Sequence, residues 1–253
     1  MKEFAILRRD AALWGEIPRW VVLAPHPDDF DAVAVTMRRL ADAGAELWLE
    51  VMTGGASGVE DQFLVGWEAK TAAREAEQRA SCELFGLAPE RIRFHRLAED
   101  AEGHMLDDQA NEDRVRSILD QSGAGGMILP HGNDTNADHR RTFRFFDRWA
   151  ASCGRPLTGL LIRDPKTRGM RIDLVTPFDA DEAEWKGGML RCHCSQHERN
   201  LRTRGHGMDS RILDVNRALA AELGLAEPFA EGFEVASYGK TMDNGQWAIA
   251  DSR

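Results

Sequence analysis

The chain has 253 residues, of which 43% are hydrophobic and 29% are charged, and these proportions are typical of a globular protein and exclude a disordered chain. Its formal net charge of -10 opposes binding to nucleic acid or to an anionic membrane, because both partners require a positive field. Neutral or cationic small molecules are therefore the expected substrates.

Targeting signals are absent from the sequence pattern. No apolar run reaches the roughly 20 residues that span a bilayer, and the first ten residues lack the apolar segment of a secretory signal. The expected location is the cytoplasm, with no membrane partner. The four cysteines are too few and too unevenly spaced for a disulfide framework, so reduced thiols are expected.

Strand and helix patterns alternate along the first 155 residues. Residues 20–24 form an apolar run that stops at Pro25, as a buried parallel strand does, and residues 32–43 have helical spacing before Gly44. The expected strands are residues 20–24, 46–53, 92–97 and 126–129, and the expected helices are residues 32–43, 67–84 and 114–121. This alternation predicts an α/β fold, and beyond residue 155 the pattern weakens.

Two groups of metal-binding side-chain types follow predicted strands. His26, Asp28 and Asp29 come directly after the first strand, and His139 follows the fourth. Loops at the carboxyl ends of parallel strands converge on one edge of the sheet, and imidazole and carboxylate are ordinary zinc ligands. The alternative for the first group is a turn closed by an aspartate side chain, with no metal.

The ordered motifs resemble the signature of the PIG-L/LmbE-like deacetylase family. The resemblance rests on Ala24-Pro25-His26-Pro27-Asp28-Asp29 and on Asp138-His139-Arg140. Thr53-Gly54-Gly55, Lys186 with His193, and Glu231-Gly232-Phe233-Glu234 add to it. It covers most of the chain and implies a Rossmann-like, mostly parallel sheet with helices on both faces.

The resemblance also implies a division of the chain and a set of roles. Residues 1–253 would form one domain, with a sheet core over roughly residues 15–165 and a less regular C-terminal lobe over roughly residues 166–253. Zn²⁺, or another divalent metal such as Fe²⁺, would be held by three ligands, and a fourth carboxylate would be the general base. On this sequence the ligands are His26, Asp29 and His139, and the base is Asp28.

Two residues depart from the family pattern. Phe30 stands where the family generally has Glu, and Asn136 stands where it often has a His that stabilises the oxyanion or protonates the leaving amine. The Asn136 amide can still donate a hydrogen bond to an oxyanion, but it cannot transfer a proton. The proton role would then move to His131 or His193, or remain with Asp28.

Four further residues receive roles with an alternative beside each. Asp138 would orient the ring of His26 or His139, or would act as a helix N-terminal acid. Gly55 would let backbone approach the pocket, and Arg140 would meet a substrate carboxylate or phosphate, unless it belongs to a solvated helix face. His193 is placed in the pocket wall by the resemblance, the alternative being a helix cap.

The predicted function is zinc-dependent removal of an acetyl group from an N-acetylglucosamine-like sugar or conjugate. One alternative is the same metal amidase chemistry on another N-acyl substrate, because pocket loops and not the metal motif choose the substrate. Another is a metal- or sugar-binding protein that has lost catalysis, which the replacement at Asn136 would favour. The sequence leaves open whether the chain forms a homo-oligomer.

Overall fold

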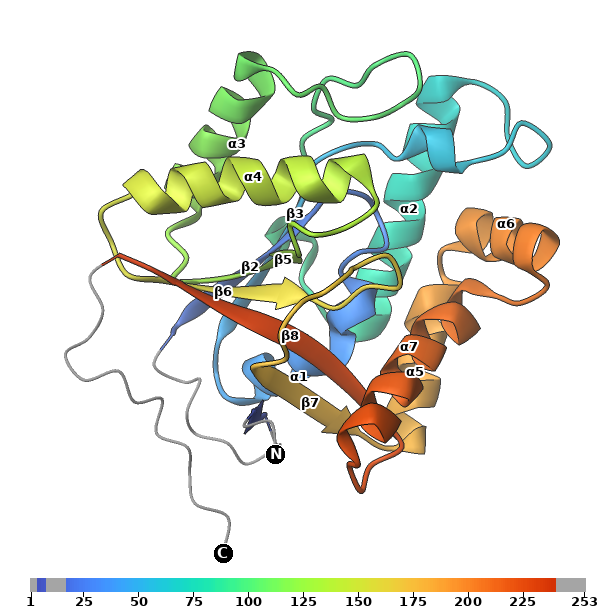
Figure 1. Ribbon diagram of the computed structural model, residues 1–253. Helices are drawn as coiled ribbons and strands as arrows, with labels where there is room; N and C mark the ends of the chain where they lie inside the picture. Colours follow the sequence, from blue (N-terminus) through green and yellow to red (C-terminus); the bar gives the residue numbers. More distant parts are fainter. Residues whose placement is uncertain (1–3, 8–16, 240–253) are drawn as a thin grey trace, which may run out of the picture.

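One eight-stranded sheet runs through the computed structural model, which describes residues 4–7 and 17–239. The strand order is β1-β7-β8-β6-β5-β2-β3-β4 (Figure 1). All pairings between these strands are parallel except the two made by β8, so the expected mostly parallel sheet is confirmed. The strands are β1 Ala5–Ile6, β2 Arg19–Ala24, β3 Glu46–Val51, β4 Ile92–Phe94, β5 Gly126–Pro130, β6 Leu157–Ile162, β7 Leu174–Phe178 and β8 Phe229–Tyr238.

Helices cover both faces of this sheet (Figure 1). They are α1 Ala34–Asp42, α2 Trp67–Phe85, α3 Gln109–Ser122, α4 Ala137–Ser152, α5 Ala180–Arg191, α6 Cys194–Arg204 and α7 Met208–Leu223, with short 3-10 turns η2 Asp31–Val33, η3 Ala56–Gly58 and η4 Pro89–Arg91. Within the described ranges, no helix is both long and apolar enough to cross a membrane.

The core divides into two layers because neighbouring side chains of a strand point to opposite faces. Trp20 and Val22 of β2 pack in a cluster with residues of α1, whereas Val21 and Leu23 pack in a second cluster with residues of α3 and α4. These strand residues are at most 1% exposed. A continuous apolar run of this kind therefore marks a strand that is buried on both faces.

The sheet extends further along the chain than the sequence pattern indicated. Because β7 and β8 belong to the same sheet, the expected limit of the sheet core at residue 165 is wrong. Pro177 lies within β7, and Glu231 and Gly232 lie within β8, so neither segment reads as an apolar strand. Helices α5, α6 and α7 make up the rest of the C-terminal region.

The strands that follow β2 in the chain are placed first on one side of it and then on the other. From β2 the strands continue to β3 and β4 on one side and to β5 and β6 on the other. The carboxyl ends of β2 and β5 are adjacent at this switch point, where open α/β sheets form their ligand-binding crevice.

Candidate metal centre and pocket

The loop after β2 is closed by one of its own carboxylates. The His26 backbone N–H donates to Asp29 Oδ2 at 2.8 Å, and the Thr53 hydroxyl and backbone N–H both donate to the Pro25 carbonyl. The aspartate-closed turn that the sequence allowed is therefore present. It does not use up Asp29, because a carboxylate has a second oxygen free for another partner.

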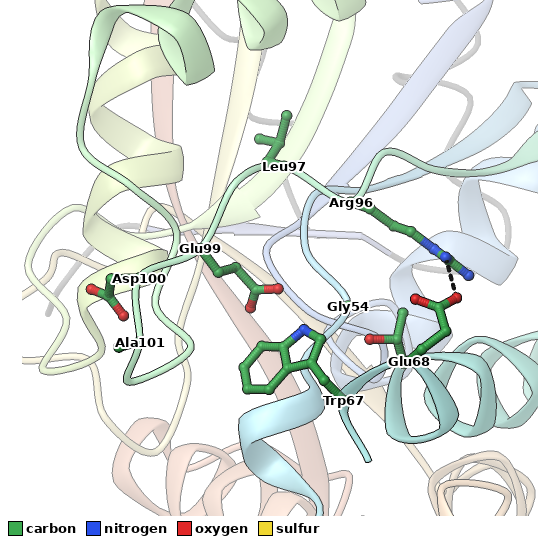
Figure 2. Close-up of a pocket in the computed structure, with 9 residues that line it drawn as sticks. Gly54, Trp67, Glu68, Arg96, Leu97, Glu99, Asp100 and Ala101 are labelled. Carbon is green, nitrogen blue, oxygen red and sulfur yellow. Dashed lines mark hydrogen bonds and ion pairs between the residues drawn. The ribbon is translucent and has the colours of Figure 1, made fainter.

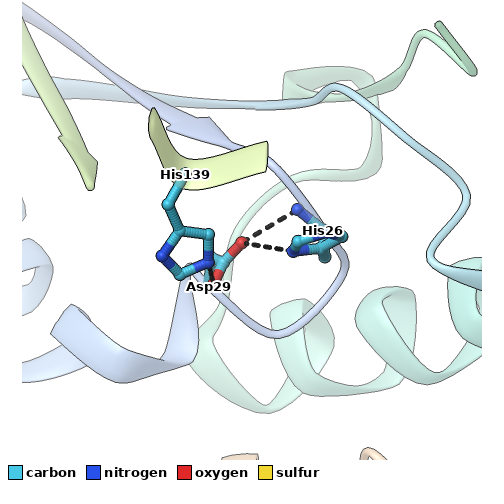
Figure 3. A group of neighbouring side chains, drawn as sticks. All are labelled: His26, Asp29 and His139. Carbon is cyan, nitrogen blue, oxygen red and sulfur yellow. Dashed lines mark hydrogen bonds and ion pairs between the residues drawn. The ribbon is translucent and has the colours of Figure 1, made fainter. Parts of the chain in front are cut away.

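Three predicted ligands meet at this loop. His139, at the start of α4, places Nε2 3.5 Å from Asp29 Oδ1, and His26 Nδ1 lies 3.5 Å from Asp29 Oδ2 (Figure 3). One ligand atom from each of His26, Asp29 and His139 lies within 4.8 Å of the others. The structure thus brings together residues that are 113 positions apart in the sequence, from His26 to His139.

Each imidazole of this group has a carboxylate on its other nitrogen. His26 Nε2 lies 2.9 Å from Asp138 Oδ2, and His139 Nδ1 lies 3.1 Å from Asp134 Oδ2. Both carboxylates are buried. Metal-bound histidines usually carry such a partner, which fixes the tautomer and the ring orientation, so this donor set fits a divalent cation.

The electrostatics of the group are dominated by these close pairs. Burial lowers the pKa of His26, but hydrogen bonds to Asp138 and Asp29 outweigh burial and raise this pKa to about 9. Burial likewise opposes the rise in the pKa of His139, which the charge of Asp29 and the bond to Asp134 bring to about 10. Against burial, the charge of His139 holds the pKa of Asp29 well below its usual range.

A second group of possible ligands shares His139. One atom each of Asp134, His139 and Asp164 also lies within 4.8 Å of the others. Asp134 is already engaged with His139 Nδ1, whereas the first group keeps Nε2 of that ring directed at Asp29. The first group is the better candidate for a metal site, because it leaves Asp134 free to act as the carboxylate behind the His139 ring.

Asp28 is held in an unusual backbone conformation beside the ligands. Its φ of 112° lies in a region that non-glycine residues rarely adopt, at a cost of about 1–3 kcal/mol. Its backbone N–H donates to Gln78 Oε1 at 2.8 Å, and its carboxylate accepts from Arg74 Nη2 at 3.0 Å. Helix α2 therefore fixes the carboxylate in the pocket wall at the expense of local strain.

Asn136 and His104 both line the pocket. Asn136 is the N-cap of α4, and its Oδ1 accepts from the Asp138 backbone N–H at 2.9 Å. This bond leaves its amide NH₂ without a bond to any other described residue. His104, from the loop between β4 and α3, places Nδ1 3.5 Å from Asp138 Oδ2 with half of its side chain exposed.

His104 was missed by the sequence analysis, and the two histidines considered there lie elsewhere. His131 contacts Glu234 and stacks on Phe143, and it does not line the pocket. His193 is fully buried, with Nε2 2.8 Å from Asp31 Oδ2. Its predicted place in the pocket wall is wrong, because its ring packs behind the loop that holds the ligands.

Of the two remaining predicted residues, Gly55 and Arg140, only Gly55 lines the pocket. Gly55 lines the pocket with φ of 60°, a conformation that side-chain-bearing residues rarely adopt, and a Cβ there would lie 3.2 Å from Pro27 Cδ, so a larger residue would be strained at this position. Arg140 does not line the pocket. Its side chain instead donates to the Asp134 carbonyl at 2.8 Å, which holds the turn before α4 and leaves no direct contact with a ligand in the pocket.

The pocket itself has a volume of about 410 Å³. It is bounded on one side by Asp28 and by the three candidate ligands His26, Asp29 and His139, referred to below as the ligand group, and on the other by residues of α6 and α7. A separate cavity of about 340 Å³ lies beside Trp67 and Glu99 (Figure 2). Burial raises the pKa of Glu99 to about 7, but the predicted ligands do not line this second cavity.

Comparison with known proteins agrees with this geometry. The fold and the site define an α/β protein with a candidate metal pocket at the carboxyl edge of its sheet. A sequence profile of the PIG-L family, described as GlcNAc-PI de-N-acetylase, matches residues 21–150, just over half of the chain. The chain belongs to this family, which confirms the resemblance seen in its motifs. No curated protein matches the sequence.

Solved structures share the fold at low sequence identity. An N,N'-diacetylchitobiose deacetylase from Pyrococcus horikoshii is 18% identical, with a TM-score of 0.72 over 88% of this chain and 85% of that one. The zinc-inhibited form of a teicoplanin deacetylase is 14% identical, with a TM-score of 0.67 over 88% and 100%. The 4-carboxy-2-hydroxymuconate hydratase of Pseudomonas putida KT2440 is 15% identical, with a TM-score of 0.66 over 90% and 99%. The fold therefore supports more than one reaction.

Proposed function

We propose that this protein is a zinc-dependent hydrolase that removes the acetyl group from the nitrogen of an amino-sugar-like substrate. The observation that carries the proposal is a fixed carboxylate, Asp28, in the same pocket as the ligand group of His26, Asp29 and His139. Membership of a family described as a de-N-acetylase, and the deacetylases among the similar structures, support the same reaction.

Two side chains of the pocket, Asp28 and Asn136, would act together with the metal in the attack of water on the amide. When bound, the metal supplies Lewis-acid polarisation of the water and of the amide carbonyl. Asp28 accepts a proton from the water as its oxygen attacks the carbonyl carbon. The Asn136 amide donates a hydrogen bond to the carbonyl oxygen as negative charge develops there.

The leaving amine needs a proton when the carbon–nitrogen bond breaks. Asn136 cannot supply one, and His104 is the exposed imidazole in the same pocket, held beside Asp138. His104 gives its proton to the departing nitrogen and regains one from solvent, so the products are acetate and the free amino sugar. The imidazole function that the family often places at position 136 thus comes from a different loop.

The first test measures metal content and amine release from a panel of N-acetylated sugars, before and after chelation. Release that disappears with the metal and returns with zinc is the expected result. Asp28→Asn should keep the metal while kcat falls about 10²- to 10⁴-fold.

Two other outcomes would redirect the function. Bound metal with release only from larger or different N-acyl compounds would indicate the same chemistry on another substrate. Bound metal with no release from any amide would indicate a binding protein or, as in the hydratase of the same fold, addition of water to another group. A chain that takes up no zinc would contradict the site itself.

A further inference from the structure

Three arginines stand in the pocket wall that α6 and α7 provide. Arg199 and Arg204 belong to α6, and Arg211 belongs to α7, which packs beside α6 (Figure 1). All three line the cavity that contains the ligand group and Asp28. We refer to Arg199, Arg204 and Arg211 as the arginine wall.

The arginine wall lacks the carboxylate partners that neighbouring arginines have. Among the described residues, the side chains of Arg204 and Arg211 make no hydrogen bond or ion pair, and the Arg199 side chain donates only to the Gly58 carbonyl, at 3.3 Å. On the same two helices, Arg202 pairs with Glu60 and Arg217 pairs with Asp214. The same helices therefore neutralise cations outside the pocket and leave them unpaired inside it.

The unpaired charges also repel one another. Burial lowers the pKa of the half-buried Arg211, and the charge of Arg204 lowers it further, with a smaller contribution from Arg199. The charges of Asp164 and Asp28, which line the same pocket without forming an ion pair with Arg211, act in the opposite direction. Arg211 lies in the first turn of α7, where the helix dipole is positive and disfavours a cation. An anion bound in the pocket would offset the repulsion among these arginines and would give their guanidinium groups a partner.

The chain as a whole contains more acidic than basic residues, whereas the arginine wall gathers three basic ones. The chain carries a formal net charge of -10, so acidic partners for three arginines are plentiful on its surface. A solvated face would explain the exposed Arg199 and Arg204, but it does not explain Arg211, which is half-buried and faces the cavity. The guanidinium fork matches the two oxygens of a carboxylate or a phosphate better than it matches a neutral hydroxyl.

We propose that the substrate carries an anionic group, a carboxylate or a phosphate, and that the arginine wall binds this group while the amide lies at the ligand group. The proposal rests on the proposed function for the amide end of the substrate. It assigns the choice of substrate to α6 and α7, and the chemistry to the loops after β2 and β5.

A matched set of substrates tests the proposal. Three N-acetylglucosamine glycosides differ only in the group attached at the anomeric oxygen: neutral hydroxyethyl, carboxymethyl, or phosphoethyl. With the zinc-loaded enzyme, kcat/KM should be about tenfold or more higher for one of the anionic glycosides than for the neutral one. Whichever anionic glycoside is preferred identifies the anion as a carboxylate or a phosphate.

Variants connect the preference to the arginine wall. Arg204→Gln and Arg211→Gln should each lower the ratio of anionic to neutral kcat/KM about tenfold, mainly through KM, while the matched control Arg217→Gln on α7 should leave the ratio unchanged. Arg204 is exposed, so its variant remains informative if Arg211→Gln fails to fold. A ratio near one for both anionic glycosides, or a ratio that both variants leave intact, overturns the proposal.

Calorimetry separates failure of this proposal from failure of the proposed function. If none of the three glycosides is hydrolysed, but an anionic one binds and Arg204→Gln weakens that binding about tenfold, the arginine wall stands and the hydrolase does not. If the neutral and anionic glycosides are hydrolysed equally well, the hydrolase stands and the anion site does not. Neither binding nor hydrolysis would overturn both.

Discussion

The charged side chains of one pocket wall are paired with opposite charges, whereas those of the other wall are not. On the wall formed by the loops after β2 and β5, His26 pairs with Asp138, His139 with Asp134, and Asp28 with Arg74. On the wall formed by α6 and α7, Arg199, Arg204 and Arg211 form no ion pair with any carboxylate of the described residues. Paired charges hold atoms in fixed positions, as metal binding and proton transfer require, whereas unpaired charges remain available to a ligand.

The net charge of the chain and the charges that line its pocket favour different substrates. The value of -10 favours neutral or cationic substrates as long as the charge is spread evenly over the surface. The arginine wall places three guanidinium groups on one side of the pocket, in a chain that is acidic overall. Net charge therefore limits nonspecific partners such as nucleic acid more reliably than it identifies a substrate.

The largest effect is expected from removing a ligand on the paired wall. His26→Ala should reduce bound metal to a trace and bring hydrolysis below detection, because two remaining ligands hold zinc poorly. His131→Ala is the matched control, since that ring lies outside the pocket against Glu234. Metal analysis and amine release measure both variants, and full metal content in His26→Ala would show that the ligands lie elsewhere.

A smaller effect is expected from the one histidine of the pocket that is half exposed. His104→Gln should lower kcat about 10²-fold, with metal content kept, because it removes the proton donor for the leaving amine. Amine release and metal analysis measure the variant, and a kcat like that of the unaltered protein would return the proton to Asp28 alone.

Weakening the pair of His139 with Asp134 should lower the affinity for zinc. Asp134→Asn should lower zinc affinity about 10- to 100-fold, because the amide can still hold the His139 ring but lacks the negative charge that makes the ring a more basic ligand. Asp113→Asn, at an exposed position on α3 bonded to Gln109, is the control. Zinc titration against a chelator measures the difference, and equal affinities would mean that Asp134 only shapes the turn.

The smallest effect is a pH dependence of thermal stability. In the metal-free protein, pKa values of about 9 for His26 and about 10 for His139 exceed the ordinary value of 6.5. Their pairs with aspartate therefore stabilise the fold fully below pH 6.5, and this contribution is lost as pH rises toward 9 and 10. Zinc requires neutral imidazoles, so its affinity increases over the same range.

Melting curves with zinc and with chelator follow from this linkage. The zinc-induced rise in Tm should grow by a few degrees between pH 6.5 and pH 8.5, since metal-free protein loses stability while zinc binds more tightly. A zinc-induced shift that is constant with pH would contradict the paired arrangement.

Sequence patterns predicted the elements whose periodicity of apolar residues matches their burial in the fold. The strand at residues 20–24 and the helix at residues 67–84 are continuous periodic segments, and the structure has them at Arg19–Ala24 and Trp67–Phe85. The ligand group was predictable because it combines ordered motifs with adjacent strand ends.

Other features depend on contacts that no local pattern encodes. Asp134 and His104 lie in polar loops, and each is defined only by the histidine or carboxylate that it meets across the pocket. Arg211 reads as an ordinary polar residue of an amphipathic helix, and its unpaired state is visible only once α6 and α7 are placed beside the ligand loops. His193 was misplaced because a motif gives its presence but not the direction of its ring.

The insertion of β8 between β6 and β7 has a consequence for the order of folding during synthesis. Strands β2 to β6 can pair as soon as they leave the ribosome, but β7 joins them only through β8, which emerges some 50 residues later. Until then β6 presents an open edge, a state that invites pairing with other chains. A chain that stops before residue 229 would therefore leave the pair of β1 and β7 separate from the remaining strands, with the edge of β6 still open.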